Sequence, residues 1–265
     1  MTAQKAPVIF IHGLWLHASS WQAWIEQFAA AGYDATAASW PGDSATVQEA
    51  RDNPDLVAGK GLEEIVAYHA EQVRTLPTKP IIIGHSFGGL IAERLAGMGL
   101  AAASVAIDPA PMKGVYILPF SALRVASIAL RNPANKSRAV SLTEAEFHYG
   151  FGNALDPAES KALYEKWNVP SPGKPLFEAA SANFMPHSPA KVEANPDRGP
   201  QLIIGGGHDH TVPASISRSS YKIENAENSA TDLHIFEDRG HSLTIDHGAP
   251  EVAQYILDWL KAKSL

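Results

Sequence analysis

Strand-like runs, most of them continuously apolar, alternate along this chain with segments whose apolar residues recur at helical spacing. The runs fall at residues 7–11, 34–39, 81–83, 102–108, 201–205 and 233–236. Short continuous apolar runs are typical of parallel strands that helices cover on both faces. Residues 61–76 lie between two of these runs and place Leu62, Ile65 and Val66 on one helical face. The alternation predicts an α/β fold with a doubly wound, mostly parallel sheet and right-handed crossovers.

The alternation of strand-like runs and helices stops in the middle third of the chain. Several helix starts follow one another there without a strand-like run. Thr143 and Glu146, for example, have the spacing of a capping box, in which two side chains satisfy free N–H groups of a first helical turn. We therefore expect residues 1–112 and 197–265 to form one core domain. Residues 113–196 are expected to form a helical cap inserted into it.

Local signals bound the first predicted helix, which carries Trp21 and Trp24 on one face. Ser19 and Ser20 have hydroxyl groups suited to capping its N-terminus. Gly32 stands where a residue of left-handed conformation ends many helices. These signals predict where the helix begins and ends.

Composition places the chain among soluble globular proteins. It has 265 residues, of which 45% are hydrophobic and 18% charged, close to the averages for that class. The formal net charge is -7 and no cluster of Lys and Arg occurs, so we expect no nucleic-acid partner, since such binding depends on neutralising phosphates. Cysteine is absent, which excludes disulfides, thiolate nucleophiles and cysteine-ligated metals.

The longest apolar stretch lies around residues 99–107 and is well short of the roughly 20 residues that a membrane-spanning helix needs. We therefore expect no membrane insertion. The first residues lead directly into a strand-like run without the pattern of a secretory signal peptide. On this ground we expect a cytoplasmic protein.

The most informative segment is Gly84-His85-Ser86-Phe87-Gly88, which joins a strand-like run to a predicted helix. It has the G-x-S-x-G pattern, in which a serine occupies a sharp, strained turn and exposes its hydroxyl at the carboxyl edge of the sheet. The glycines on either side avoid collisions with the strand and the helix. A glycine-rich connection without chemistry is the alternative, but the strand-and-helix context favours Ser86 as a nucleophile.

A serine hydroxyl needs a neighbouring base, and that base needs a group that orients it. Of the 11 histidines, His241 stands out because it follows the run at 233–236 and precedes the last predicted helix. This position brings it to the same edge of the sheet as Ser86. His247 is the alternative base, although it directly precedes the helix start at Ala249, where a structural role is as natural.

Asp209 is the predicted acid, because it follows the run at 201–205 and completes the order Ser, Asp, His that suits this arrangement. Asp108 also ends a strand-like run and is the alternative acid, although a turn residue before a proline is the simpler interpretation. His208 and His210 flank Asp209 and raise the question of a metal site. Adjacent residues of one loop rarely converge on one ion, so we expect no metal.

Attack by serine on a carbonyl creates an oxyanion that two backbone N–H groups stabilise. One expected donor is Phe87, directly after the nucleophile. The other is expected in the loop after the first strand, at Leu14, with Trp15 as the alternative. His12 in the same loop is interpreted as a hydrogen-bonding residue that stabilises the loop, rather than as a second base.

With these motifs in place, the chain resembles the α/β-hydrolase superfamily from Val8 through Leu260. Three motifs carry the resemblance: the His12-Gly13 loop, the elbow from Gly84 to Gly88, and the pair Asp209 and His241 further along the chain. The part before Gly114 is most similar to small bacterial esterases and to the plant methylesterase and hydroxynitrile-lyase group. The resemblance implies a cofactor-independent serine hydrolase whose helical segment is the family's cap.

Departures from neighbouring subfamilies exclude some chemistries. Haloalkane dehalogenases and epoxide hydrolases have an aspartate as the nucleophile, whereas this sequence has Ser86. The lyases have Thr in the oxyanion loop and Lys after the catalytic histidine, whereas this sequence has Gly13 and Ser242. The resemblance therefore favours hydrolysis over cyanohydrin cleavage.

These features predict a serine hydrolase that cleaves a carboxylic ester or lactone of a small, fairly apolar substrate through an acyl-enzyme. Trp15, His85, Phe147 and Phe151 are candidates for the substrate pocket, and most other cap aromatics are expected in the cap's own core. We expect a small-molecule substrate, no cofactor, and a monomer or homodimer. Two interpretations stay open: other triad chemistry, such as C–C bond hydrolysis, perhydrolysis or natural-product tailoring, and a receptor-like binding module with slow hydrolysis.

Overall fold

Six parallel strands form the central sheet of this computed structural model, which describes residues 5–226 and 230–265. The strands are β1 (Val8–Ile11), β2 (Ala35–Ala38), β3 (Ile81–His85), β4 (Ala103–Ile107), β7 (Gln201–Gly206) and β8 (Thr231–Phe236). Their order across the sheet is β2-β1-β3-β4-β7-β8. The predicted α/β fold is confirmed, and the strand order changes direction between β1 and β3.

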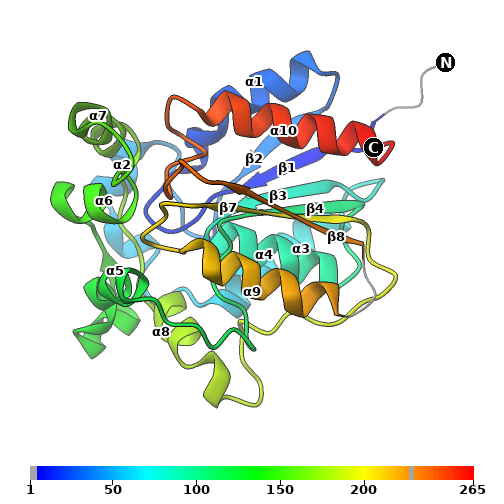
Figure 1. Ribbon diagram of the computed structural model, residues 1–265. Helices are drawn as coiled ribbons and strands as arrows, with labels where there is room; N and C mark the ends of the chain where they lie inside the picture. Colours follow the sequence, from blue (N-terminus) through cyan, green and yellow to red (C-terminus); the bar gives the residue numbers. More distant parts are fainter. Residues whose placement is uncertain (1–4, 227–229) are drawn as a thin grey trace.

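Helices cover both faces of the sheet and give a three-layer architecture (Figure 1). On one face lie α1 (Gln22–Ala30) and α10 (Ala249–Ala262), and on the other lie α3 (Leu62–Arg74), α4 (Phe87–Gly97) and α9 (Ala214–Asn225). Shorter pieces follow β1 and β2, namely η1 (Ala18–Trp21), α2 (Val47–Asp52) and η2 (Pro54–Leu56).

Each face of the sheet has its own apolar core. In β3, Ile81 and Ile83 belong to the core that includes Trp24 of α1, whereas Ile82 belongs to the core that includes Leu90 of α4. Successive side chains of a strand point to opposite faces, so a strand that is covered on both faces is apolar at every position. This burial explains the continuous apolar runs in the sequence.

The first helix begins differently from the prediction. His17, and neither Ser19 nor Ser20, caps η1, because its Nδ1 accepts a hydrogen bond from the Ser19 N–H at 3.2 Å. The Ser19 hydroxyl is itself bound to that ring nitrogen at 2.8 Å and so is not used to cap the helix. Gly32 has φ +87°, the left-handed conformation predicted for the end of α1.

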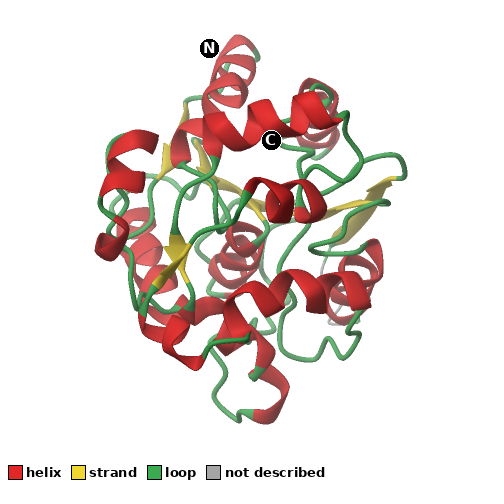
Figure 2. Ribbon diagram, turned by 90° about the vertical axis from the view of Figure 1, so that its left-hand side faces the viewer, coloured by secondary structure: helices red, strands yellow, loops and turns green. Residues whose placement is uncertain are grey.

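Between β4 and β7 the chain forms a group of helices at the carboxyl end of the sheet. These are α5 (Phe120–Leu130), α6 (Glu144–Gly150), α7 (Pro157–Trp167) and α8 (Lys174–Ala180), with the short turns η3 (Pro133–Ser137) and η4 (Ala182–Phe184). They lie at the left of Figure 1 and face the viewer in Figure 2. As predicted, Thr143 and Glu146 form a complete capping box at the start of α6.

The sequence did not indicate the short antiparallel pair β5 (Ala139–Val140) and β6 (Ser171–Pro172) within this segment. The segment predicted to be a cap shares its core with the sheet, since Val125, Phe147 and Phe151 belong to the same apolar cluster as Leu90 and Ile91 of α4. These helices therefore pack as a continuation of the core on that face. Among the described residues, no helix has the length and apolar character needed to cross a membrane.

Glu93 of α4 is a fully buried carboxyl group in this core region. Neither of its carboxyl oxygens has a hydrogen-bond partner within the described part of the chain. Burial and the neighbouring Glu224 raise the pKa of Glu93 well above its usual value, although the charge of Arg198 opposes this effect. Glu93 is therefore protonated and neutral over a wider pH range in the folded chain than in the unfolded chain.

We expect Glu93→Gln to flatten the pH dependence of folding stability. Because the folded pKa lies above the unfolded one, the protonated carboxyl stabilises the fold fully below the unfolded pKa, and this contribution is lost as pH rises through the folded pKa. The loss is about 1.4 kcal/mol for each pH unit between the two values. Urea unfolding at a series of pH values measures it, with Glu71→Gln on exposed α3 surface as the control. Equal pH slopes for wild type and Glu93→Gln would contradict this account.

Candidate active site

Three loops at the carboxyl edge of the sheet each hold a non-glycine residue in a left-handed backbone conformation. Trp15 after β1 has φ 66°, Ser86 after β3 has φ 57° and Asp108 after β4 has φ 42°. Such conformations cost about 1–3 kcal/mol each and are common at functional sites, where the surrounding structure enforces them. The strands β1, β3 and β4 are neighbours, and ligands of open α/β sheets bind where the strand order changes direction.

Ser86 occupies the tight turn from β3 into α4. Its N–H donates to the Ile107 carbonyl at 2.9 Å, and its carbonyl accepts from the Ala110 N–H at 3.0 Å. A Cβ on Gly84 would overlap the Gly88 carbonyl, so only glycine permits this turn. The strand, turn and helix of the predicted elbow are therefore present, with Ser86 at the tip.

A histidine and a carboxylate from two other loops form a short buried hydrogen bond. His241 Nδ1 donates to Asp209 Oδ2 at 2.6 Å, and neither side chain is accessible to solvent. The second oxygen, Oδ1, accepts from the N–H groups of Thr211 at 2.6 Å and Val212 at 2.8 Å. Since Nδ1 carries the hydrogen, Nε2 of the neutral ring is left with a free electron pair.

Asp108, the alternative acid, approaches His241 less closely. Its Oδ2 lies 3.9 Å from His241 Nδ1, which is too long for a hydrogen bond, and its Oδ1 accepts from the Gly206 N–H at 2.7 Å. Burial and the neighbouring Asp209 raise the pKa of Asp108 well above its usual value. Asp108 therefore stays a neutral carboxylic acid to a higher pH than an ordinary aspartate does, while Asp209 makes the hydrogen bond to His241.

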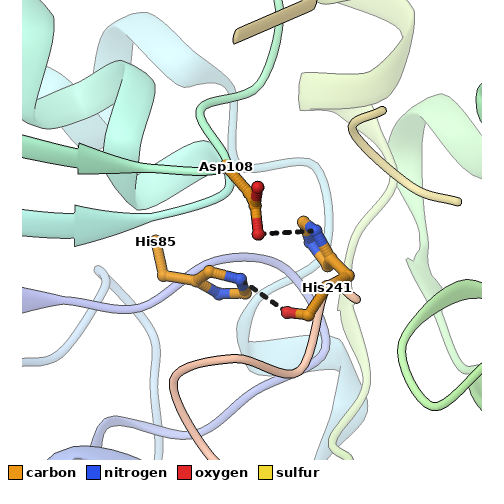
Figure 3. A group of neighbouring side chains, drawn as sticks. All are labelled: His85, Asp108 and His241. Carbon is orange, nitrogen blue, oxygen red and sulfur yellow. Dashed lines mark hydrogen bonds and ion pairs between the residues drawn. The ribbon is translucent and has the colours of Figure 1, made fainter. Parts of the chain in front are cut away.

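Figure 3 shows His85, Asp108 and His241 directed toward one another. His85 Nε2 donates to the backbone carbonyl of His241 at 2.9 Å, and the two ring centroids are 4.5 Å apart. Burial, followed by the nearby His241, lowers the pKa of His85 well below its usual value, so this ring is neutral. His85 thereby links the elbow of Ser86 to the backbone of His241.

These three residues also place potential metal-ligand atoms within 4.8 Å of one another. Both His85 Nε2 and His241 Nδ1 carry the hydrogen that they donate. The Asp209 carboxylate and the His241 carbonyl accept these two hydrogens, so both rings are held by hydrogen bonds within the protein. We therefore interpret the group as the polar surroundings of His241.

Two backbone N–H groups near Ser86 are without an acceptor. Phe87 is the first residue of α4, so its N–H has no carbonyl one turn earlier in the helix. Within residues 5–226 and 230–265, the Leu14 N–H also donates no hydrogen bond. The Trp15 N–H, in contrast, donates to the Ser171 hydroxyl at 2.6 Å. Of the two candidates in this loop, Leu14 therefore has the free donor.

His12 holds the peptide that carries the Leu14 N–H. Its Nδ1 donates to the Gly13 carbonyl at 2.8 Å. The C=O and N–H of a trans peptide point in opposite directions, so this bond turns the Leu14 N–H away from His12. A Cβ on Gly13 would lie 2.6 Å from the Ser86 Cβ, which shows that this peptide packs against the serine.

The other nitrogen of His12, Nε2, bonds the Asp43 carboxylate at 2.8 Å, and the same carboxylate oxygen accepts from the Trp40 N–H at 2.6 Å. Burial alone would raise the pKa of Asp43, but His12 holds it below its usual value. Both nitrogens of His12 are thus engaged, one with the Gly13 carbonyl and one with the Asp43 carboxylate, which fixes the ring in the loop.

The sequence analysis did not select Asp43 or Ser171, although both hold the loop after β1. Asp43 follows β2 at the carboxyl edge of the sheet, and that position was an available signal. Ser171 lies 156 residues from its partner Trp15, and no local pattern indicates such a contact.

An apolar cavity of about 250 Å³ opens beside Ser86, beneath the cap. Its walls include Trp15, Met112, Val125, Leu176, Val212 and Ile216. Within the described part of the chain, no Asp, Glu, Lys, Arg or His side chain lines it. The cavity therefore suits an uncharged, apolar group next to the serine hydroxyl.

Of the four pocket candidates, only Trp15 lines this cavity. His85, Phe147 and Phe151 are instead buried behind it, and the Phe151 ring meets the His241 ring edge-on with centroids 4.7 Å apart. Phe147 stacks on Phe151 at 4.9 Å. Phe147 of α6 and Phe151, which directly follows α6, therefore pack on the side of His241 and do not line the cavity.

The remaining candidate histidines lie elsewhere. His247 has a side chain that is 66% exposed and bonds Glu159 of α7 at 2.9 Å. His208 is exposed, and His210 bonds the Tyr149 carbonyl at 3.0 Å. These side chains are therefore not gathered around Asp209 or Ser86.

The Ser86 hydroxyl and His241 are not hydrogen-bonded to each other in this structure, since His241 Nε2 has no partner among the described residues. Hydrogen bonds between a nucleophile and its base are often long before substrate binds. The free electron pair of Nε2 and the hydroxyl of Ser86 are thus both unengaged.

Solved structures of several hydrolases superpose on nearly the whole chain. A monoacylglycerol lipase from Paleococcus ferrophilus has 22% identity and a TM-score of 0.69, covering 96% of this chain and 95% of that chain. A methylesterase from Arabidopsis has 15% identity and a TM-score of 0.66, covering 97% and 99%. A pyrethroid hydrolase from Sphingobium faniae has 18% identity and a TM-score of 0.65, covering 98% of each chain. At such identities the likeness is one of fold.

Among curated proteins no sequence matches this chain. The model of the alpha/beta hydrolase family, in contrast, matches residues 8–255, which include the elbow and the loops of Asp209 and His241. The chain therefore belongs to the alpha/beta hydrolase family, and the resemblance that its motifs indicated is confirmed.

Proposed function

We propose that this protein hydrolyses a carboxylic ester or lactone of a small, apolar substrate through an acyl-enzyme formed on Ser86. The observation that carries the proposal is the buried 2.6 Å hydrogen bond between His241 and Asp209. His85 links the backbone of His241 to the elbow of Ser86, and Ser86 lines an apolar cavity. This arrangement offers a nucleophile, a base and an orienting acid in the order that such hydrolases use.

In the proposed reaction, Ser86 Oγ attacks the carbonyl carbon while His241 Nε2 takes the hydroxyl proton. The imidazolium that forms is stabilised by the Asp209 carboxylate. Collapse of the tetrahedral intermediate breaks the bond to the alkoxy oxygen, which leaves as the alcohol with the proton from His241. Water then attacks the acyl-enzyme with His241 again as base, and the carboxylic acid departs.

The developing oxyanion needs donors that are already in place. The free N–H groups of Leu14 and Phe87 are the proposed pair, and the ring of His12 holds the Gly13 carbonyl of the same loop. Donors fixed before the reaction stabilise the charge without reorganisation, which makes them a large part of catalysis.

Specificity follows from the cavity. A volume of about 250 Å³ without a charged wall favours an uncharged acyl or aryl group, because burying an unpaired charge there would be costly. Polar or charged parts of the substrate would remain outside, toward solvent.

We expect Ser86→Ala to lower kcat for p-nitrophenyl esters by at least about 10³-fold, because the acyl-enzyme no longer forms. Hydrolysis of the acetate, butyrate and octanoate measures the loss, and a fluorophosphonate label located by mass spectrometry identifies the nucleophile. Ser137→Ala, an exposed serine on η3, is the matched control. A label on another residue, or full turnover by Ser86→Ala, would refute the assignment.

We expect Asp209→Asn and Asp108→Asn to differ strongly. Asp209 orients His241 and carries the charge, so its amide should lower kcat by about 10³–10⁴-fold. Asp108 has a raised pKa and lies 3.9 Å from His241, so its amide, a close match to a protonated carboxyl, should cost less than about tenfold in kcat. Steady-state kinetics with one soluble ester compares them, and the reverse ranking would assign the acid to Asp108.

We expect Asp43→Asn to lower kcat while leaving KM nearly unchanged. Asp43 is a positioning residue, because it acts on the oxyanion only through His12 and Gly13. The loss should be about tenfold, below the roughly 10²–10³-fold that removal of an oxyanion donor costs. If the variant instead raises KM at constant kcat, the His12 and Asp43 pair does not act on the oxyanion.

A further inference from the structure

The cap exposes an unusual concentration of large apolar side chains. Of the ten exposed large hydrophobic residues in the described part of the chain, seven lie on two cap segments. These seven, here called the cap patch, are Tyr116, Ile117, Leu118, Phe120, Leu123, Phe184 and Met185. Phe184 is 87% exposed and Phe120 is 80% exposed, so these rings lie in water in the isolated molecule.

Hydrogen bonds hold the two segments of the cap patch side by side. Lys113 Nζ donates to the carbonyls of Met185 at 2.6 Å and Pro186 at 2.9 Å. The side chain of Asn183 accepts from the Gly114 N–H at 2.7 Å and donates to the Val115 carbonyl at 2.7 Å. The two segments therefore form one continuous surface that hydrogen bonds hold together.

The cap patch surrounds the entrance of the cavity beside Ser86. Five of its members also line that cavity, namely Tyr116, Ile117, Leu118, Leu123 and Phe184. Phe120 and Met185 do not line it and extend the apolar surface outward from the entrance. Whatever covers the cap patch thus lies against the entrance itself.

The charge of the two segments opposes that of the whole chain. Residues 113–131 and 181–190 contain three cations, Lys113, Arg124 and Arg131, and no Asp or Glu, whereas the chain has a formal net charge of -7. Arg131 lies 3.9 Å from Glu146, and Arg124 lies over the Tyr149 ring at 3.8 Å. Apolar side chains on segments that themselves carry Lys and Arg but no Asp or Glu are complementary to an anionic lipid surface.

We propose that the cap patch docks on an anionic lipid surface, with Phe120, Phe184 and Leu118 inserted among the lipid chains. This contact would bring the entrance of the cavity to the place where apolar molecules collect. A second copy of the chain seated on the cap patch would instead cover both entrances, and three cations facing three cations would oppose that pairing.

Flotation with vesicles tests the docking in the absence of substrate, so its outcome is independent of whether Ser86 hydrolyses esters. The vesicles contain equal parts of phosphatidylglycerol and phosphatidylcholine, and pure phosphatidylcholine vesicles test the role of charge. We expect wild type to bind the anionic vesicles, and binding to weaken with added salt and with neutral lipid.

The decisive variant carries Phe120→Glu together with Met185→Glu, two exposed positions outside the cavity wall. Phe120 opens α5, where a glutamate suits the helix dipole, so the fold should tolerate it. Loss of the inserted side chains should weaken binding by at least about tenfold. Leu56→Glu on η2, at a position that is 56% exposed, is the matched control and should bind as wild type does.

Turnover of p-nitrophenyl acetate should be the same in all three proteins, which reports an intact site and fold. Failure of wild type to bind anionic vesicles, or equal binding by the double variant, would overturn the proposal. Sedimentation velocity supplies a further test, because a wild-type dimer that the double variant dissociates would assign the cap patch to a second copy of the chain.

Discussion

Close packing of the loop after β1 against the turn after β3 is the constraint on which the rest of the site depends. Gly13 lies so near Ser86 that a Cβ would come within 2.6 Å of the serine Cβ. This approach occurs between β1 and β3, where the strand order changes direction and ligands of such sheets bind. Hydrogen bonds hold the first loop in place. His12 bonds the Gly13 carbonyl and the Asp43 carboxylate, and the Ser171 hydroxyl of β6 accepts from the Trp15 N–H.

The same crowding explains how charge is distributed around His241. Asp209 and Asp108 both approach the ring, but Asp209 accepts hydrogen bonds at both oxygens, whereas Asp108 accepts one, from the Gly206 N–H. Burial and the neighbouring Asp209 raise the pKa of Asp108 well above its usual value, which disfavours a second negative charge beside the ring. In the proposed mechanism this matters, because two carboxylates would stabilise the imidazolium so strongly that it would return its proton to the leaving alcohol only reluctantly.

Much of the fold could be predicted from the sequence, because strands covered on both faces are apolar at every position, as Ile81, Ile82 and Ile83 are. The helix α2 was missed, since none of its residues is buried and it therefore has no apolar period. Its only signal was the capping box of Thr46 and Glu49. The strands β5 and β6 have two residues each and are too short for any pattern.

The candidate site was likewise predictable only where a residue's place follows from the strands. The sequence indicates Ser86, Asp209 and His241 because each follows a strand, and parallel strands bring their carboxyl ends to one edge. The residues that line the pocket follow no such rule. An aromatic side chain at helical spacing shows that one face of the helix is buried, but it does not show whether the core, a substrate or another molecule buries that face. Phe151 is packed against His241, whereas Phe184 of the same cap is 87% exposed at the cavity entrance. The sequence cannot distinguish these two aromatic side chains, because only the packing of the cap helices on the sheet decides which of them is buried in the core and which lies in the proposed lipid-binding surface.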